Sequence, residues 1–256
     1  MRLDSKIAII TGAGSGIGHA AAALFAREGA KVVVADINDT GGQDTVNLIR
    51  TTGGEAIFVH TDVTNATEAE QLIRRTMNTY GSLDILYNNA GIPLRPKAVE
   101  KIGEDEWDNI FAVNIKGTFL VTKYAIPEMK KTKSGCIINT SSIGAVRARP
   151  QWSPYASSKA AVIGFTRALA IELAPYNIRA NCVIPAATDT PIVSLCLPEG
   201  TTEEHIEEWK KNMVTTIPLG RMIEPEEVAY AALYLASSDS SMVTGIELNI
   251  DGGRGV

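Results

Sequence analysis

Short apolar runs rich in Val and Ile alternate with longer amphipathic segments along almost the whole chain. The apolar runs predict buried strands: residues 7–10, 31–35, 55–59, 83–87, 136–139, 178–184 and 246–250. The segments between them predict helices at residues 17–28, 40–51, 66–80, 105–129, 154–173 and 225–235. Gly29, Gly53 and Gly81 follow the first three helical segments, where glycine commonly ends a helix.

This alternation predicts an α/β fold in which a parallel sheet is covered by helices on both faces. We expect a doubly wound Rossmann arrangement with a seven-stranded parallel sheet. The chain of 256 residues is 45% hydrophobic, which suits one well-filled core. No repeat, low-complexity tract or linker divides it, so residues 1–256 are predicted to form a single domain.

Residues 186–216 depart from the alternation. They follow a predicted strand, begin with Thr188-Asp189-Thr190-Pro191 and contain the turn residues Pro198-Glu199-Gly200. Thr201-Thr202-Glu203-Glu204 resembles a capping box, and an apolar stripe follows it. An amphipathic surface helix would explain the stripe. Because the segment follows the carboxyl end of a strand, we favour a small helical lid over a substrate crevice.

Tyr155 and Lys159 lie four residues apart in the helix predicted at 154–173, so their side chains share one face. A phenol has a pKa near 10, and a nearby ammonium favours its ionised form. Such a pair can turn the tyrosine into an acid/base near neutral pH, particularly beside an oxidised nicotinamide. Many isolated Tyr/Lys pairs with this spacing simply lie on a solvent-exposed helix face. The residues around the pair therefore determine whether a catalytic role is favoured.

The surroundings of Tyr155 favour a catalytic role. Ser153 and Pro154 predict an N-cap and a first-turn proline, which would put Tyr155 in the first turn of its helix. Ser142 comes just after the buried run that ends at Thr140. Open α/β sheets bind ligands at the carboxyl ends of their strands. Ser142 and Tyr155 are therefore predicted to meet a substrate.

A glycine-rich turn between the first predicted strand and helix predicts a phosphate-binding cradle. Gly12, Gly16 and Gly18 follow the pattern T-G-x-x-x-G-I-G, which differs from G-x-G-x-x-G. A structural bend alone would also use glycines, but Asp36 ends the second strand, where an acidic residue can bind ribose hydroxyls. Asp36 would also repel the 2′-phosphate of NADP. Since neither Ala13, Ser15 nor Ile37 is basic, NAD is the predicted cofactor.

With these motifs in order, the chain resembles the short-chain dehydrogenase/reductase family over essentially its full length. The elements that carry the resemblance are Thr11–Gly18, Asn88-Asn89-Ala90-Gly91, Asn114 with Ser142, and Tyr155 with Lys159. The resemblance implies that Tyr155 is the general acid/base and that Ser142 hydrogen-bonds the substrate oxygen. It implies that Lys159 holds the nicotinamide ribose and lowers the pKa of Tyr155, and that Asn114 supports a water-linked proton relay to Lys159. The alternative is that Asn114 is an ordinary polar residue buried in the middle of a helix, without a role in catalysis.

The resemblance also implies the remaining cofactor contacts. Asp62 would accept from the adenine amino group, although it could instead begin a helix, with Asn65 as the alternative cap. The other implied cofactor residues are Ser15, Ile17, Ile37, Val63, Asn89, Ala90, Gly91, Pro185, Thr188 and Thr190. One departure is that Ala186 stands where the family usually has glycine after Pro185, and alanine adopts positive φ less readily. The turn beneath the nicotinamide is therefore expected to differ.

Composition narrows the cellular context. A net charge of −5 does not indicate a basic surface that would bind nucleic acid or an anionic membrane. No apolar run is long enough to span a membrane. Cys136, Cys182 and Cys196 are widely spaced, as in ordinary cytoplasmic thiols. No metal site is expected, because no His, Cys or carboxylate cluster has ligand spacing. The resemblance implies a homotetramer of D2 symmetry built on helices 105–129 and 154–173.

The predicted function is NAD-dependent hydride transfer between a nicotinamide and a secondary alcohol or ketone. Three alternatives remain: a 3-oxoacyl-thioester (acyl carrier protein) reductase using NADP(H), a methyltransferase, and a non-catalytic nucleotide-binding scaffold. A methyltransferase would leave Ser142, Tyr155 and Lys159 without a role. The substrate stays open among a sugar or polyol, a hydroxy acid, a steroid and a β-ketoacyl thioester. Candidate pocket residues are Gly144, Arg149, Gln151, Ala187 and the segment 192–197.

Overall fold

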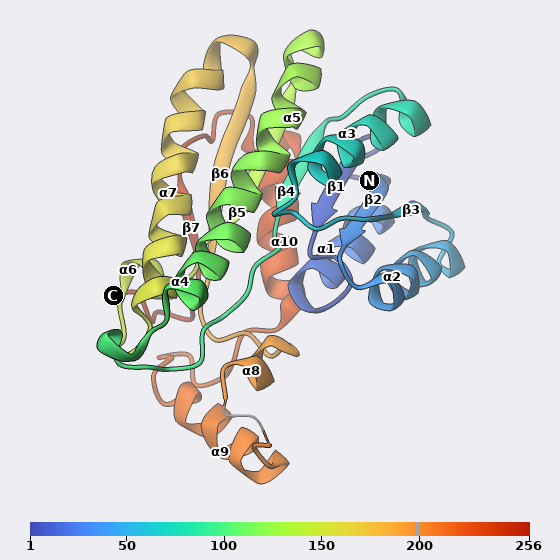
Figure 1. Ribbon diagram of the computed structural model, residues 1–256. Coiled ribbons are helices and arrows are strands. Elements are labelled where there is room, and N and C mark those ends of the chain that lie inside the picture. Colours follow the sequence, from blue (N-terminus) through green and yellow to red (C-terminus); the bar gives the residue numbers. More distant parts are fainter. Residues whose placement is uncertain (198–199) are drawn as a thin grey trace.

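The computed structural model describes residues 1–197 and 200–256, and a seven-stranded parallel sheet runs through its centre (Figure 1). The strand order is β3-β2-β1-β4-β5-β6-β7. The strands are β1 (Ile7–Thr11), β2 (Lys31–Asp36), β3 (Glu55–His60), β4 (Ile85–Asn88), β5 (Gly135–Thr140), β6 (Ile178–Pro185) and β7 (Glu247–Ile250). The order reverses between β1 and β4, which creates the crevice where doubly wound folds bind dinucleotides. The predicted fold class is confirmed.

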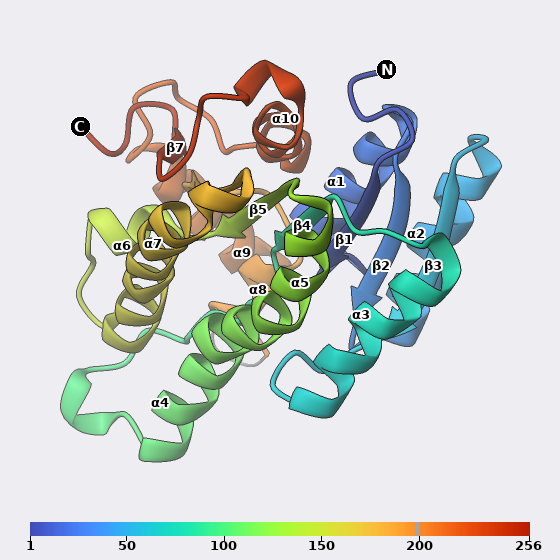
Figure 2. The same cartoon turned by 90° about the horizontal axis from the view of Figure 1, so that it is seen from above.

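Helices cover both faces of the sheet, as Figure 2 shows. One face carries α1 (Gly16–Arg27), α2 (Asp39–Thr51) and α10 (Pro225–Ala236), and the other carries α3 (Ala66–Tyr80), α5 (Thr118–Thr132) and α7 (Ser153–Leu173). Short 3₁₀ turns occur at η1 (Val99–Lys101), η3 (Ala174–Tyr176) and η4 (Ser238–Ser240). Among the described helices, none is both long and apolar enough to cross a membrane.

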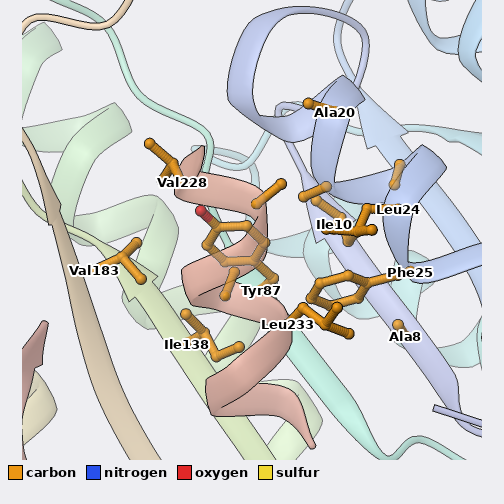
Figure 3. Close-up of a cluster of buried hydrophobic side chains, with 14 of the residues drawn as sticks. Ala8, Ile10, Ala20, Leu24, Phe25, Tyr87, Ile138, Val183, Val228 and Leu233 are labelled. Carbon is orange, nitrogen blue, oxygen red and sulfur yellow. The ribbon is translucent and has the colours of Figure 1, made fainter. Parts of the chain in front are cut away.

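Alternate strand residues supply the two cores. Ile9 and Leu86 belong to the cluster under α3, α5 and α7, whereas Ile10 and Tyr87 belong to the cluster under α1 and α10. Figure 3 shows the ring of Tyr87 among apolar side chains of the sheet, α1 and α10. Both faces of the strands are buried, which explains why they read as continuous apolar runs rather than as alternating patterns.

The prediction of one helix over 105–129 is wrong in part. The structure has α4 (Glu104–Phe111), then a π-helical stretch, η2 (Ala112–Gly117), and then α5. Inside that stretch the side chain of Asn114 pairs with the backbone of Ile92 in both directions. Such π segments occur frequently at functional sites. Gly117 at the end of the stretch is the one local sign of the change. The contact between Asn114 and the distant loop at Ile92 has no local sequence pattern.

The prediction that Ser153 caps α7 is also wrong. The helix begins at Ser153 itself, with Trp152 at the N-cap position and no side-chain cap. The hydroxyl of Ser153 is buried without a hydrogen-bond partner in the described part of the chain. Pro154 does occupy the first turn, as predicted, so Tyr155 lies at the start of the helix.

Two helices follow β6 and lie together beyond the carboxyl ends of the strands (Figure 1). They are α8 (Ile192–Leu195) and α9 (Glu203–Val214), and Thr202 caps α9 by accepting from the amide of His205. Lys210 of α9 forms an ion pair with Asp189 at 3.0 Å, which ties the helix to the loop after β6. Pro198 and Glu199, part of the predicted turn, lie outside the described residues.

Candidate active site

A cavity of about 660 Å³ opens at the carboxyl ends of the strands, between the glycine-rich turn and α8. All of the predicted catalytic and cofactor-binding residues line it except Gly18 and Asn114. Of the candidate substrate residues, Gly144, Arg149, Ala187 and residues 192–196 line it as well. Gln151 and Leu197 do not, so their prediction as pocket residues is wrong. The exposed Gln151 instead accepts a backbone hydrogen bond from Lys97 outside the cavity.

The glycine-rich turn has no room for side chains. Gly12 has φ of +63°, and a Cβ there would lie 2.8 Å from the Cα of Ala90. A Cβ on Gly18 would lie 2.1 Å from the carbonyl oxygen of Gly12, so Gly18 allows close packing of helix on turn rather than contact with a ligand. Ser15 precedes α1 without a side-chain cap. The first turn of α1 therefore points open backbone towards the cavity, as a phosphate-binding helix end requires.

Asp36 is fixed by two backbone amides at the other end of this turn. Its Oδ2 accepts from the amide of Gly14 at 2.8 Å, and its Oδ1 accepts from the amide of Asn38 at 2.9 Å. Each carboxylate oxygen keeps further acceptor capacity. Ile37 beside it is 63% exposed. Among the described lining residues the only lysine or arginine side chains are Lys159 and Arg149. Lys159 donates to the carbonyl oxygen of Thr140 and Arg149 acts on Tyr155, so neither is paired with Asp36.

Asp62 lines the same part of the cavity. Its Oδ1 accepts from the amide and the hydroxyl of Thr64, at 2.9 and 2.8 Å. The helix that follows is capped by Asn65, whose side chain accepts from the amides of Thr67 and Glu68. Asp62 is therefore not the helix cap, which leaves its carboxylate facing the cavity available to a ligand.

The pKa of Tyr155 does not move in the predicted direction in the chain alone. Burial raises this pKa, while a hydrogen bond with Ser142 and the positive charge of Arg149 lower it. Lys159 is not among the groups that act on it. In the protein without a cofactor, burial outweighs the partners present, so the pKa of Tyr155 is raised. The lowering by Lys159 that the resemblance implies, beside a bound nicotinamide, stays a prediction.

Lys159 is 4% exposed and its Nζ donates to the carbonyl oxygen of Thr140 at 2.9 Å. Burial lowers its pKa to about 8. Gly91 lies between this ammonium and Asn114: a Cβ on Gly91 would sit 3.1 Å from Lys159 Nζ and 3.2 Å from Asn114 Oδ1. Asn114, which is fully buried, also donates to Ser158 Oγ at 3.1 Å. The fold therefore brings Asn114 Oδ1 and Lys159 Nζ to the same small space beside one glycine.

The depressed pKa of Lys159 has a consequence for stability. Between about pH 8 and pH 10.5 the unfolded chain binds more protons than the folded one, so raising the pH through this window removes a destabilising contribution. Lys159→Met cannot titrate. We expect its stability advantage over the wild-type chain to shrink by about 2 kcal/mol between about pH 7.5 and pH 9.5.

Urea unfolding of both cofactor-free proteins at equal concentration measures this difference. Titrating groups that do not interact with Lys159 are common to both chains and cancel in the comparison. Cys182, whose pKa Lys159 lowers, titrates near 11, above this pH window. A difference that is the same at both pH values would mean that Lys159 keeps its ordinary pKa in the folded protein.

The turn after β6 forms with alanine in place of glycine. Neither Ala186 nor Ala187 is among the described residues with positive φ. The amide of Ala186 donates to Ile250 at 3.0 Å, and Ala187 accepts from Ile223 at 3.0 Å. Thr188 Oγ1 donates to the carbonyl oxygen of Ala186 at 3.1 Å. These hydrogen bonds hold Thr188 at the cavity wall, and the turn needs neither Ala186 nor Ala187 to adopt a positive φ.

Two tryptophans line the cavity; the sequence placed Trp209 in the apolar stripe of the predicted lid, but Trp152 was missed. Trp152 packs edge-on against Tyr155 with ring centroids 5.6 Å apart, and Trp209 enters from α9. The helical spacing of the apolar residues in the predicted lid indicated that Trp209 would face inward. The only sequence feature near Trp152 was its position next to Ser153, which did not predict a place in the cavity. Within residues 1–197 and 200–256, no three His, Cys, Asp or Glu side chains are grouped as metal ligands.

Comparison with known proteins agrees with this geometry. The family model described as "Enoyl-(Acyl carrier protein) reductase" matches residues 12–254. An uncharacterized oxidoreductase of Thermotoga maritima is 43% identical over 99% of this chain and 98% of its own length. The 3-oxoacyl-[acyl-carrier-protein] reductase of the same organism is 40% identical, covering 99% of each chain. A cyclopentanol dehydrogenase of Comamonas sp. is 39% identical, covering 98% of each.

A solved structure gives the same picture in three dimensions. The 3-ketoacyl-(acyl-carrier-protein) reductase from Brucella melitensis, complexed with NADH, superposes with a TM-score of 0.91 at 36% identity, covering 99% of this chain and 100% of that one. The seven-stranded sheet, the glycine-rich turn and the Ser142, Tyr155 and Lys159 side chains on one cavity are consistent with these relatives. The chain belongs to the short-chain dehydrogenase/reductase family.

Proposed function

We propose that this oxidoreductase is an NAD-dependent enzyme that interconverts a secondary alcohol and its ketone. The observation that carries the proposal is a single cavity with a different chemistry at each end. Asp36 and the glycine-rich turn at one end suit a ribose and a pyrophosphate. Ser142 and Tyr155 at the other end are hydrogen-bonded to each other, as needed to hold and protonate one oxygen.

When bound, NAD supplies the acceptor or donor for the hydride. The protein's residues supply orientation and the proton. Ser142 would hold the substrate oxygen, and Tyr155 would give it a proton in ketone reduction or take one in alcohol oxidation. The buried cation of Lys159 would bind the nicotinamide ribose and, with Asn114, pass the proton onward through the space beside Gly91.

Residues 186–216 would act as a lid in this mechanism. Ile192, Val193 and Leu195 of α8 and Trp209 of α9 face the cavity with apolar surface. Closing such a surface over the substrate excludes water, which strengthens the hydrogen bonds at Ser142 and Tyr155. The Lys210–Asp189 ion pair would link the movement of α9 to the loop that carries Thr188 and Thr190.

The second candidate is reduction of a 3-oxoacyl thioester with NADP(H). It is favoured by the similarity to the Thermotoga maritima and Brucella melitensis acyl-carrier-protein reductases. The absence of a basic residue beside Asp36 among the described lining residues argues against NADP. A methyltransferase or a scaffold would have no use for Tyr155 hydrogen-bonded to Ser142.

An absorbance assay separates these functions. NADH and NADPH consumption is followed with cyclopentanone, with acetoacetyl-CoA and with neither. The proposal predicts oxidation of NADH that depends on a ketone. Activity confined to acetoacetyl-CoA with NADPH would select the second candidate, and no consumption of either cofactor with any carbonyl compound would contradict both.

We further propose a cytoplasmic homotetramer of D2 symmetry. The thiols of Cys136, Cys182 and Cys196 are free, as expected in a reducing compartment. Phe119 of α5 is 43% exposed and Ile171 of α7 is 80% exposed, so both outer helices present apolar side chains to a partner. Light scattering at micromolar concentration is expected to give the mass of four chains, and a monomer would contradict this.

A further inference from the structure

Arg149 is a cation in the cavity without an anionic partner. It lies between α6 (Ile143–Val146) and α7 and lines the cavity. Its Nη1 contacts Met213 Sδ of α9 at 3.0 Å, and no carboxylate of the described residues forms an ion pair with it. A thioether sulfur is a weak acceptor, whereas a guanidinium carries five N–H donors. Most of its hydrogen-bonding capacity is therefore unused.

The neighbourhood of Arg149 adds positive charge rather than neutralising it. Arg254 is only 5% exposed, its Nε has no partner among the described atoms, and its pKa is lowered to about 10 by burial and then by Arg149 and Arg147. Asp251 is occupied elsewhere, because it accepts from the amides of Gly253 and Gly255. Arg149 is half-buried, and Arg254 is buried with a hydrogen bond from its Nη1 to Thr216 Oγ1 but no ion pair among the described residues. Keeping such cations together without a counter-charge costs stability. An anion bound at Arg149 would offset that cost.

Arg149 lies near the reacting end of the cavity. Arg149 and Tyr155 line the same cavity, and the positive charge of Arg149 lowers the pKa of Tyr155, although burial outweighs this effect. Trp152, Leu195 and Trp209 line the same cavity with largely apolar surface, and the thiol of Cys196 also acts on Arg149. One cation in an apolar wall beside the acid/base is the arrangement that orients a small substrate with one charged end.

We propose that Arg149 binds a carboxylate of the substrate itself, so that the enzyme acts on an oxo acid and the corresponding hydroxy acid. The inference rests on the proposed function and names its substrate class. A carboxylate fits the planar guanidinium with two parallel hydrogen bonds. The phosphate of a long pantetheine arm would bind far from the reacting carbon, which does not suit a cation that acts on Tyr155.

The test compares acids with their neutral methyl esters. The probes are 3-oxobutanoate, 4-oxopentanoate and 3-oxocyclohexanecarboxylate, each against its methyl ester, with NADH. The wild-type protein is expected to prefer at least one acid over its ester in kcat/KM. Arg149→Leu is expected to lower that acid-to-ester ratio by about 100-fold, the loss of two charge-assisted hydrogen bonds. Arg149→Lys is expected to restore part of it.

Controls separate charge at this position from charge in general. Arg74→Leu removes an exposed arginine of α3 that does not line the cavity, and its acid-to-ester ratio is expected to match the wild type. Acetoacetyl-CoA and acetoacetyl-N-acetylcysteamine form a further pair. If Arg149→Leu impairs only the coenzyme A thioester, Arg149 binds a distant phosphate and the proposal fails.

Failure of this inference is distinguishable from failure of the proposed function. Reduction of the esters and of cyclopentanone without preference for any acid overturns only the assignment of Arg149. Absence of all ketone reduction overturns the proposed function. Calorimetry with cyclohexanecarboxylate and the NADH-loaded protein then still decides the inference: binding that is weakened in Arg149→Leu supports it, and equal or absent binding in both proteins contradicts it.

Discussion

Replacing Tyr155 by Phe is expected to lower kcat by about 10²–10⁴-fold, the contribution of a positioned general acid/base. The substitution removes only the hydroxyl that is hydrogen-bonded to Ser142. The ring stays, so the edge-on contact with Trp152 and the shape of the cavity are kept. Stopped-flow and steady-state rates of NADH oxidation with a ketone measure the loss. NADH fluorescence is expected to report cofactor binding close to that of the wild type.

A matched control removes a different tyrosine hydroxyl. Tyr80 also carries a buried hydroxyl, which has no hydrogen-bond partner in the described structure, and it lies outside the cavity. Tyr80→Phe is expected to retain wild-type turnover. Near-normal turnover in Tyr155→Phe would mean that the proton comes from another group. Loss of NADH binding in that variant would instead point to a structural role for the hydroxyl.

Much of the sheet could be predicted from the sequence because it depends on local patterns. Runs such as residues 32–35 are apolar on both faces, and Gly81 ends α3 with φ of +79°, as its position predicted. Observed strand ends differ from the predicted ones by one or two residues, as at Leu83, which precedes β4. These signals lie within a few residues of the structure that they predict.

The site residues that could be predicted from the sequence are those at the carboxyl ends of strands. Asp36, Asn88 and Thr140 each end a strand, and a parallel sheet brings such residues to one edge. Features set by distant contacts gave no local signal. The π-helical stretch depends on Asn114 pairing with Ile92, and Trp152 reaches the cavity only because α7 begins one residue after it.

The direction of the pKa of Tyr155 could not be predicted for a related reason. The spacing to Lys159 is a local property, but burial depends on the whole cavity. Lys159 itself is buried and directed to the carbonyl oxygen of Thr140. A lower pKa at Tyr155 therefore requires a further positive charge, which an oxidised nicotinamide would add in the complex.

The protein is expected to prefer NAD over NADP by at least about 100-fold in kcat/KM, equivalent to about 2.7 kcal/mol. Asp36 is held by the amides of Gly14 and Asn38, so its orientation is set before the cofactor arrives. Its remaining acceptor capacity can take two ribose hydroxyls, and hydrogen bonds to a charged group contribute about 1.5–3 kcal/mol each. Against NADP the same carboxylate meets a phosphate of like charge, so attraction and repulsion act together.

Steady-state kinetics with both cofactors test this preference, with Asp36→Ala/Ile37→Arg as the variant that should shrink or reverse it. Ile37 is exposed at the cavity, so an arginine there can reach a 2′-phosphate without disturbing the core. Asp39→Ala is the control, since it removes an exposed carboxylate that pairs with His60 outside the cavity. Loss of the preference in Asp39→Ala as well would point to net charge rather than to the position of Asp36. Equal or better activity of the wild-type protein with NADP would mean that the two backbone amides hold Asp36 away from the ribose rather than towards it.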